Sequence, residues 1–390
     1  MKINKLFQFE QRIIDFMEKH INLIVFSILI ILAVGTRYLL LSYESPDYIV
    51  FLKPWFEALK ESGGLKALAN YPGDYNAPYM TIMALLTYIK INPLYTLKAV
   101  SIFFDFLLAI ITYKLIKEVL AKDKNNKHYA MVGTIAMLFL PTILLDGAFW
   151  SQCDVIYTTF IVFALYYLYK EKMTKSFIFL GLSFSFKLQF VFILPVYLIL
   201  YFKKRNFSII NFFIIPLVDF ILCIPSIIAG KPILECLLVY AKQTQTYNSL
   251  NLNFPNIYSL INGSEKYLSK LGIVLLIVIF ALVFWYIVKK KIKFNFESIL
   301  LLSIWSIVIC TFLLPYMHER YMFAADVLSI IYAIIYKRNF LIALGIEFIS
   351  IVSYTMFLFN NYEIPSYILA FIFLAIVIYL TKDVKQLLEK

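Results

Sequence analysis

The chain alternates long apolar runs with short polar segments, and this pattern predicts a bundle of membrane-spanning helices. The first run, at about 21–41, follows a charged segment whose pattern is helical. Because this run is too long for a signal-peptide core and lacks a small-residue cleavage site, we expect an uncleaved first span. Further apolar runs lie at 95–117, 129–145, 152–169, 207–229, 270–288, 296–314, 322–336, 340–359 and 364–381.

Two other apolar segments do not fit a single crossing. Segment 176–202 is long for one span and short for two, and lysines flank it on both sides. It predicts two short helices that meet at Lys187 in a cleft, because half-length helices at membrane depth need protein or water around them. We expect segment 78–91 to pack at the outer face, since a crossing there would place the lysines of 114–127 outside.

The basic residues predict the orientation. Of the 36 lysines and arginines, 24 fall in seven segments: 1–20, 114–127, 170–175, 203–205, 289–293, 337–338 and 382–390. Cytoplasmic loops of membrane proteins are enriched in these residues. The pattern therefore predicts about twelve spans with both termini in the cytoplasm. It also accounts for most of the net charge of +12, so this charge does not indicate nucleic-acid binding.

Composition supports the same class. Hydrophobic residues make up 62% of the chain, and charged residues only 15% against a globular norm of about 25%. A soluble protein of this size could not be coated with so little polar surface. We find no internal repeat and no linker, and predict one all-α polytopic domain over 1–390 in the cell membrane. Its large outer loops are 43–94 and 230–269.

The first outer loop contains two candidate carboxylates. Asp47 comes just after the first span, and Asp74 lies in a Gly-Asp turn. Asp47 fits a solvated helix end as well as a functional group, whereas a turn favours a structural role for Asp74. Between them, 49–69 has an amphipathic pattern that predicts helices lying on the membrane surface.

Two further outer loops carry polar side chains. The loop DGAFWSQCD at 146–154 contains Trp150, Gln152 and Asp154. Trp150 fits an interfacial anchor as well as a platform for a sugar ring, and Asp154 fits a helix cap. The loop PYMHERY at 315–321 contains the triplet His-Glu-Arg, in a chain with few arginines.

These cations suit an anionic ligand. The guanidinium of Arg320 can bind phosphate or carboxylate through a planar fork, although a simple pair with Glu319 is the alternative. Lys187, between two short apolar helices, needs a partner or water. For the intramembrane acids we favour interhelical pairs or span ends over a proton relay; they are Asp105, Asp219, Asp326 and Glu347.

Known soluble-enzyme motifs are missing from the sequence. It contains neither a Walker nor a GxGxxG loop, and its cysteines and histidines do not have zinc-site spacing. We therefore expect no cofactor, and no divalent metal is indicated. Cys153 and Cys236 are both assigned to outer loops, and the sequence leaves open whether they are bonded.

A wet outer cleft with a carboxylate and several cations suits transfer from a lipid phosphate. Fixed cations would stabilise the developing charge on a phosphate leaving group. A nearby aspartate would accept the proton of the attacking hydroxyl. Aromatic and amide side chains would hold the sugar.

Four sequence blocks carry a resemblance to a known family. They are SPDY with KPWFEAL (45–59), WSQCDVIY (150–157), SFKLQ (185–189) and PYMHERYMF (315–323). With these blocks in this order, the chain resembles the GT-C superfamily of membrane glycosyltransferases. The similar branch is the bacterial one related to GPI-anchor mannosyltransferases and dolichyl-phosphate-glucose glucosyltransferases. The block WSQ stands where many relatives have WGQ.

The resemblance implies a GT-C-like fold and inverting transfer at the extracytoplasmic face. It also implies that the acidic residue of the first outer loop, here Asp47, is the catalytic base. The metal-associated acidic pair of oligosaccharyltransferases is not evident. We expect a polyprenyl-phosphate-linked hexose as donor and an envelope glycan or lipid-linked saccharide as acceptor, in contact with membrane lipids and without nucleic acid.

The candidate residues divide into three sets. Asp47 is the predicted base; His318, Arg320 and Lys187 form the predicted donor-phosphate set; Gln189, Gln152, Asp154, Trp150, Glu319 and Asp74 form the predicted substrate-binding set. Two alternatives remain at this level. A transporter or flippase of polyprenyl-linked saccharides would use the intramembrane acids and contain an inverted repeat. A polysaccharide ligase or polymerase would use diphosphate-linked donors.

Overall fold

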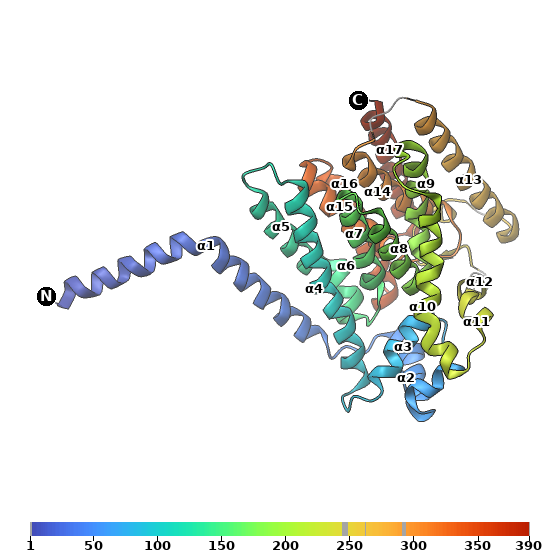
Figure 1. Ribbon diagram of the computed structural model, residues 1–390, viewed down its shortest axis with the longest axis horizontal. Coiled ribbons are helices and arrows are strands. Elements are labelled where there is room, and N and C mark those ends of the chain that lie inside the picture. The colour runs from blue at the N-terminus through green and yellow to red at the C-terminus, as the bar shows by residue number, and fades with distance from the viewer. Residues whose placement is uncertain (1, 244–248, 262, 291–293, 390) are drawn as a thin grey trace.

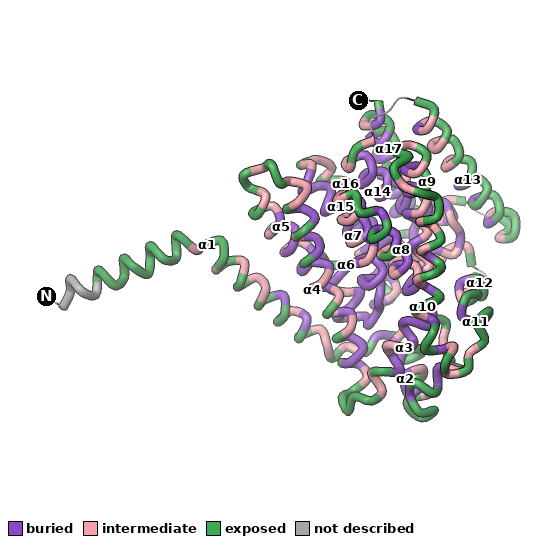
Figure 2. The backbone as a smooth tube through the Cα atoms, viewed as in Figure 1, coloured by how far each residue is buried: buried purple, intermediate pink, exposed green. Residues whose placement is uncertain are grey.

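The computed structural model describes residues 2–243, 249–261, 263–290 and 294–389, and most of them are helical (Figure 1). The only strands among them are β1 (Asn251–Leu252) and β2 (Met317–His318), which pair in parallel. Buried positions concentrate where the helices pack together, while the outer helices are exposed on one side (Figure 2). The predicted all-α polytopic class is confirmed.

Seven helices in the described part of the chain are long and apolar enough to cross a membrane. They are α1 (Lys2–Leu40), α4 (Pro93–Val119), α10 (Ile214–Ala229, extended by η5 at Ile209–Phe213), α13 (Glu265–Lys289), α14 (Phe296–Leu313), α16 (Phe340–Phe359) and α17 (Ser366–Glu389). An eighth span is formed if α5 (Asn126–Phe139) joins the segment of α6 (Pro141–Ile143) and η3 (Leu144–Phe149) across a 44° bend. Proline lacks an N–H, which explains a break at Pro141.

The count of seven or eight is lower than the predicted twelve for a physical reason. Segments 152–169 and 322–336 form α7 (Asp154–Tyr169) and α15 (Phe323–Tyr336), of 16 and 14 residues. A helix needs about 20 residues to cross the hydrocarbon core. Both helices are strongly apolar because they lie inside the bundle, so hydropathy alone did not separate them from crossing helices.

The predicted break at Lys187 is present. α8 (Met173–Phe186) ends there, Lys187 is extended, and η4 (Leu188–Ile193) leads into α9 (Leu194–Lys204). The segment predicted to pack rather than cross is α3 (Ala77–Leu86), whose first N–H is capped by the Asn76 side chain.

The first outer loop is helical over most of its length, as expected. It comprises η1 (Tyr48–Leu52), α2 (Lys53–Glu61) and η2 (Gly64–Ala69), and α2 packs against both η2 and α3. The second large loop contains α11 (Ile233–Leu237), α12 (Val239–Gln243) and η6 (Ile257–Ser259). Residues 244–248 and 262 of this loop lie outside the described residues.

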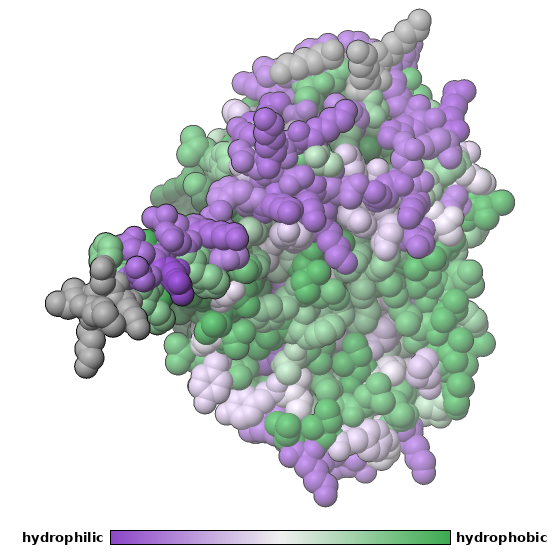
Figure 3. Space-filling model, turned by 60° about the vertical axis from the view of Figure 1, so that its left-hand side comes forward, coloured by the Kyte–Doolittle hydropathy of each residue, from purple (hydrophilic) through white to green (hydrophobic). Residues whose placement is uncertain are grey.

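Several of the segments predicted to be cytoplasmic meet at one end of the bundle, which we call the basic end. Ion pairs join Lys170 to Glu118 (2.6 Å) and Lys337 to Asp123 (3.5 Å), and Lys203 donates to a main-chain oxygen of α13. α2 and α3 lie at the other end (Figure 1). Polar residues cover the upper and lower parts of the surface, with a hydrophobic belt between them (Figure 3).

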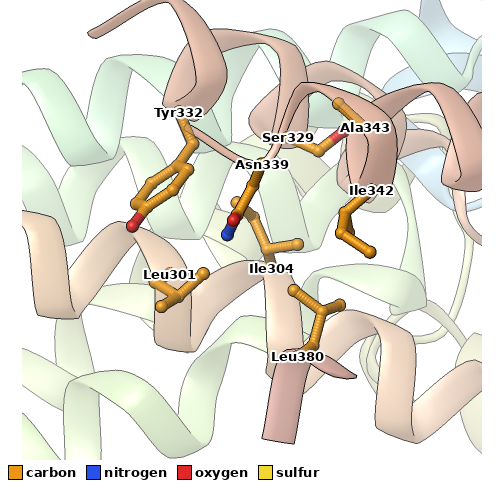
Figure 4. Close-up of a pocket in the computed structure, with 8 residues that line it drawn as sticks. All are labelled: Leu301, Ile304, Ser329, Tyr332, Asn339, Ile342, Ala343 and Leu380. Atoms are coloured by element: carbon orange, nitrogen blue, oxygen red, sulfur yellow. The ribbon is translucent and has the colours of Figure 1, made fainter. Parts of the chain in front are cut away.

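A small cavity between α14, α15, α16 and α17 lies towards the basic end (Figure 4). Two of its lining residues define its place: the Tyr332 hydroxyl donates to Glu297 (3.3 Å), and the Asn339 amide donates to Asp383 (2.5 Å). Arg338 also pairs with both acids. This polar cluster joins the ends of three helices, and none of the predicted site residues lines the cavity.

The four intramembrane acids have partners, as predicted. The pairs are Asp105 with Arg37 (2.8 Å), Asp219 with Asn76 (2.9 Å), Asp326 with Ser350 (2.8 Å) and Glu347 with the main chain and hydroxyl of Thr142 (2.9 Å each). An unpaired charge in hydrocarbon is costly. These contacts therefore give the acids an interhelical role.

Candidate functional site

Asp47 lies at the centre of a polar cluster at the end opposite the basic end. Its Oδ2 accepts hydrogen bonds from Trp150 Nε1 (3.0 Å) and Gln152 Nε2 (2.5 Å), and Arg320 Nη1 lies 3.4 Å away. Oδ1 has no hydrogen-bond partner among the described residues, and the side chain is 13% exposed. Three donors on one oxygen fix the orientation of the carboxylate and leave the other oxygen accessible.

Buried hydroxyls hold the loop that supplies two of these donors. Ser45 Oγ donates to the Trp150 carbonyl, and Ser101 Oγ donates to the Gln152 carbonyl, both at 2.6 Å. Between them Ser151 has a left-handed backbone (φ 72°), which turns the chain from η3 into α7. Since Ser45 also precedes Asp47 by two residues, the same contact connects the two loops.

Lys98 fixes the chain on the other side of Asp47. Its Nζ is fully buried and donates to the carbonyls of Leu40, Leu41 and Tyr43, at 3.1, 3.0 and 2.7 Å. The last carbonyls of a helix have no intrahelical partner. Lys98 therefore caps the C-terminal end of α1 and positions the segment that leads to Asp47.

Asp154 and Lys187 form a buried ion pair. Lys187 Nζ lies 2.8 Å from Asp154 Oδ2, and Arg320 Nε lies 3.5 Å from the same oxygen. Asp154 begins α7, and its main-chain N–H donates to Asp146 Oδ2 (3.2 Å). Lys187 thus has the partner that its position required, and the cap of α7 is Asp146.

The histidine-glutamate-arginine triplet closes the cluster. Arg320 Nη1 donates to Glu319 Oε1 (2.9 Å), and His318 Nδ1 lies 3.8 Å from Glu319 Oε2. β2 carries His318 and pairs with Leu252 of β1, so the amide-rich part of the second outer loop lies beside the triplet. Burial alone would raise the pKa of Glu319, but its contacts with His318 and Arg320 hold that pKa below its usual value.

The charges within this cluster largely neutralise one another. Three carboxylates, from Asp47, Asp154 and Glu319, face the two permanent cations, Arg320 and Lys187. In this conformation Arg320 and Lys187 are paired with carboxylates and do not form an open binding site for phosphate. A donor phosphate must therefore share Arg320 and Lys187 with these acids, and the predicted donor-phosphate role stays a prediction.

Trp150 lies differently from both of its expected positions. Its ring is fully buried, stacked on Phe357 (4.9 Å between centroids) and at right angles to Tyr354, with the Arg320 guanidinium 5.2 Å away. It is therefore neither an interfacial anchor nor, in this conformation, a surface for stacking a sugar. It positions Asp47 instead.

Two other predicted substrate-binding residues are not part of the cluster. Asp74 is exposed. The hydrogen bond from the Gln243 side chain goes to its main-chain oxygen and not to its carboxylate. Gln189 is half-buried in η4, and its side chain makes no hydrogen bond to the cluster within the described residues. Its position two residues after the extended Lys187 does not bring it to Asp47.

Tyr75 and Asp146 belong to the site but were not predicted as site residues. Asp146 contacts the cluster through the main-chain N–H of Asp154. The Tyr75 hydroxyl donates to Gln152 Oε1 (2.9 Å), and Lys187 Nζ lies 5.7 Å from its ring. Burial raises the pKa of this phenol well above its usual value, so it remains a donor. Tyrosine is too common in this chain, at 29 residues, for its sequence position to have marked it.

All four cysteines are free. Cys153 is fully buried beside Asp154, and burial raises the pKa of its thiol to about 12. Cys236 packs instead with Cys223 and Ala77 in a separate apolar cluster. A bond between Cys153 and Cys236 is therefore not present.

Within the described residues, no group of three or more histidine, cysteine, aspartate or glutamate side chains is arranged to hold a metal ion. No family model matches the chain, and no curated protein matches it in sequence. The arguments for function therefore rest on the geometry of the cluster and on the four sequence blocks.

Proposed function

We propose that the protein is an inverting membrane glycosyltransferase that moves a hexose from a polyprenyl-phosphate donor to a hydroxyl of an envelope glycan or lipid-linked saccharide. One observation carries this proposal. The four blocks of the family resemblance, far apart in sequence, contribute Asp47, Gln152 with Asp154, Lys187 and Arg320 to one connected cluster.

The geometry of Asp47 suits a general base. Oδ1 accepts the proton of the acceptor hydroxyl while Trp150 and Gln152 hold Oδ2. The hydroxyl oxygen forms a bond to the anomeric carbon, and the bond from that carbon to the phosphate oxygen breaks. Polyprenyl phosphate leaves with the electron pair, and the nearby Arg320 stabilises the charge that develops.

The location of the cluster supports action on the extracytoplasmic side. It lies at the end of the bundle opposite the basic end, where the lysine-rich segments meet. Since lysine and arginine favour the cytoplasmic side, the carboxylate cluster then faces outward.

The alternative of a transporter is less well supported. It requires ionisable groups that change partners through the membrane depth, but each intramembrane acid has a specific contact. The gathering of three carboxylates with Arg320 and Lys187 around Asp47 fits an enzyme better.

The direct test is turnover by the full-length protein in nanodiscs, supplied with polyprenyl-phosphate glucose or mannose and with lipid-linked saccharides as acceptors. We expect release of polyprenyl phosphate with formation of a glycosidic bond, and a loss of about 10²–10⁴-fold in the Asp47→Asn variant. Glu57→Gln, an exposed acid of the same loop, is the matched control. Transfer from diphosphate-linked donors only, or movement of donor across a vesicle bilayer without transfer, would contradict the proposal.

A further inference from the structure

Helix α1 is much longer than a membrane span requires. Its 39 residues extend for about 58 Å at 1.5 Å per residue, whereas the hydrocarbon core is about 30 Å thick. Residues 21–40 are sufficient to cross it. The preceding part of the helix projects away from the bundle and bends relative to the rest of α1 (Figure 1), and residues 7–19 are exposed (Figure 2).

This projecting part, residues 7–20, has two distinct faces. At 100° per residue, one half of the helix carries Phe7, Phe9, Ile13, Ile14, Phe16 and Met17, and the other half carries Gln8, Gln11, Arg12, Asp15, Glu18 and Lys19. Only Glu10 and His20 interrupt the apolar half. The six apolar side chains are 43–60% exposed, so nothing in the bundle covers this face.

The charges on the polar half are also ordered. Arg12 and Lys19 are seven residues apart and therefore lie almost in line, beside Phe16 at one border of the apolar half. Asp15 and Glu18 lie farther from that border. Long basic side chains at such a border can extend to lipid phosphates while their methylene groups remain on apolar surface.

The attachment of α1 determines which end of the protein this segment leaves. Its C-terminal end is held beside the site by Lys98, and the Arg37–Asp105 pair lies one turn before. The N-terminal half therefore emerges at the basic end. A helix continuous with a membrane span has the headgroup region as its immediate surroundings.

We infer that residues 7–20 of α1 lie in the plane of the membrane at the basic end. Their apolar half is buried at the boundary between headgroups and acyl chains, and Arg12 and Lys19 contact anionic phospholipid headgroups. The apolar half is then covered by lipid, not by a second copy of the chain. This inference does not depend on the proposed glycosyl transfer.

Spin labels on each face test the placement in the full-length protein in nanodiscs. The four native cysteines are buried, so the unsubstituted protein measures background labelling. We expect labels at Phe9→Cys and Phe16→Cys to collide preferentially with oxygen. Labels at Gln11→Cys and Asp15→Cys should collide preferentially with a water-soluble nickel complex. Equal access of the nickel complex to both faces would overturn the inference, as would strong spin–spin coupling between labels on the apolar half of two copies.

Lipid composition tests the headgroup contact. Replacing phosphatidylcholine with phosphatidylglycerol should shift the Phe16→Cys label deeper, and the double change Arg12→Gln, Lys19→Gln should abolish this shift. Asp15→Asn, which alters a charge away from the border, is the control and should retain it. A shift that survives in the Arg12→Gln, Lys19→Gln variant would contradict the assignment of these two residues.

Discussion

Gln152 and Asp47 are joined by a hydrogen bond of 2.5 Å between the amide nitrogen and Oδ2, and the amide oxygen of Gln152 simultaneously accepts the Tyr75 hydroxyl. This arrangement determines which end of the amide faces the carboxylate. An ionised carboxylate only accepts hydrogen bonds, so the amide nitrogen must face Asp47, and the amide oxygen is left for the Tyr75 hydroxyl. Tyr75 thereby acts on Asp47 through Gln152.

The Gln152→Glu variant should therefore lose activity and change its pH dependence. It places a second carboxylate against Asp47, removes a donor, and at neutral pH should lower kcat by about tenfold or more. Two adjacent carboxylates raise the pKa of one of them. Acidification would then protonate the pair and restore one hydrogen bond, so the optimum of kcat should move to lower pH. Gln386→Glu, on an exposed part of α17, is the control and should keep the original profile.

Trp150→Phe separates the hydrogen bond of Trp150 from its packing. Phenylalanine retains a ring between Phe357 and Tyr354 but has no N–H for Asp47. Because a hydrogen bond to a charged group contributes about 1.5–3 kcal/mol, we expect the rate to fall by at least about tenfold with little change in folded yield.

Trp305→Phe is a matched control for this measurement. Trp305 is also buried, and its Nε1 donates one hydrogen bond of 2.9 Å to Thr381 of α17. Its replacement should reduce thermal stability modestly without an effect on turnover. Equal losses of activity in the two variants would show that Trp150 contributes only packing.

Much of the architecture was predictable because local chemistry determines it. The lysines on both sides of segment 176–202 indicated a break at Lys187, and an ammonium at membrane depth indicated a partner there. The partner itself, Asp154, was among the candidates, but its distance could not be predicted because it depends on how α7 packs against α8. The same limit applies to Trp150, whose burial depends on residues of α16 more than 200 positions away.

The number of spans and the contacts of Arg320 were less predictable from the sequence. Hydropathy identifies apolar segments but cannot tell a short buried helix such as α15 from a crossing one, since both consist mainly of apolar residues. Likewise, Arg320 was expected to be available for phosphate. A pair with the neighbouring Glu319 was the alternative, but Asp47 and Asp154 come from two other segments, and only the folded chain brings them to Arg320.

The buried pair of Lys187 and Asp154 should matter far more for stability than an exposed pair. Lys187→Met leaves Asp154 buried with only the more distant Arg320, and breaking a buried pair costs about 3–5 kcal/mol. The comparison is Lys170→Met at the basic end, where the side chains are 34% and 37% exposed and the expected cost is much smaller because solvent screens the pair. Thermal unfolding in detergent measures both. The double change Lys187→Met, Asp154→Asn should recover part of the loss, and no recovery would contradict a pairwise interaction.

Glu319 should make the stability of the protein sensitive to acid. Its contacts with His318 and Arg320 outweigh the effect of burial and hold its pKa in the folded protein below its usual value near 4.5. The unfolded chain therefore takes up a proton at Glu319 at a higher pH than the folded protein does. The stabilisation by Glu319 is fully present above about pH 4.5 and is lost as the pH falls through the lower pKa of the folded protein.

We expect the melting temperature of wild type to fall more steeply than that of Glu319→Gln as the pH is lowered from 5 to 3. Glu319→Gln should already be less stable at pH 7, because a neutral amide cannot replace the carboxylate beside Arg320. Parallel acid profiles for the two proteins would show that Glu319 is not the group that His318 and Arg320 stabilise.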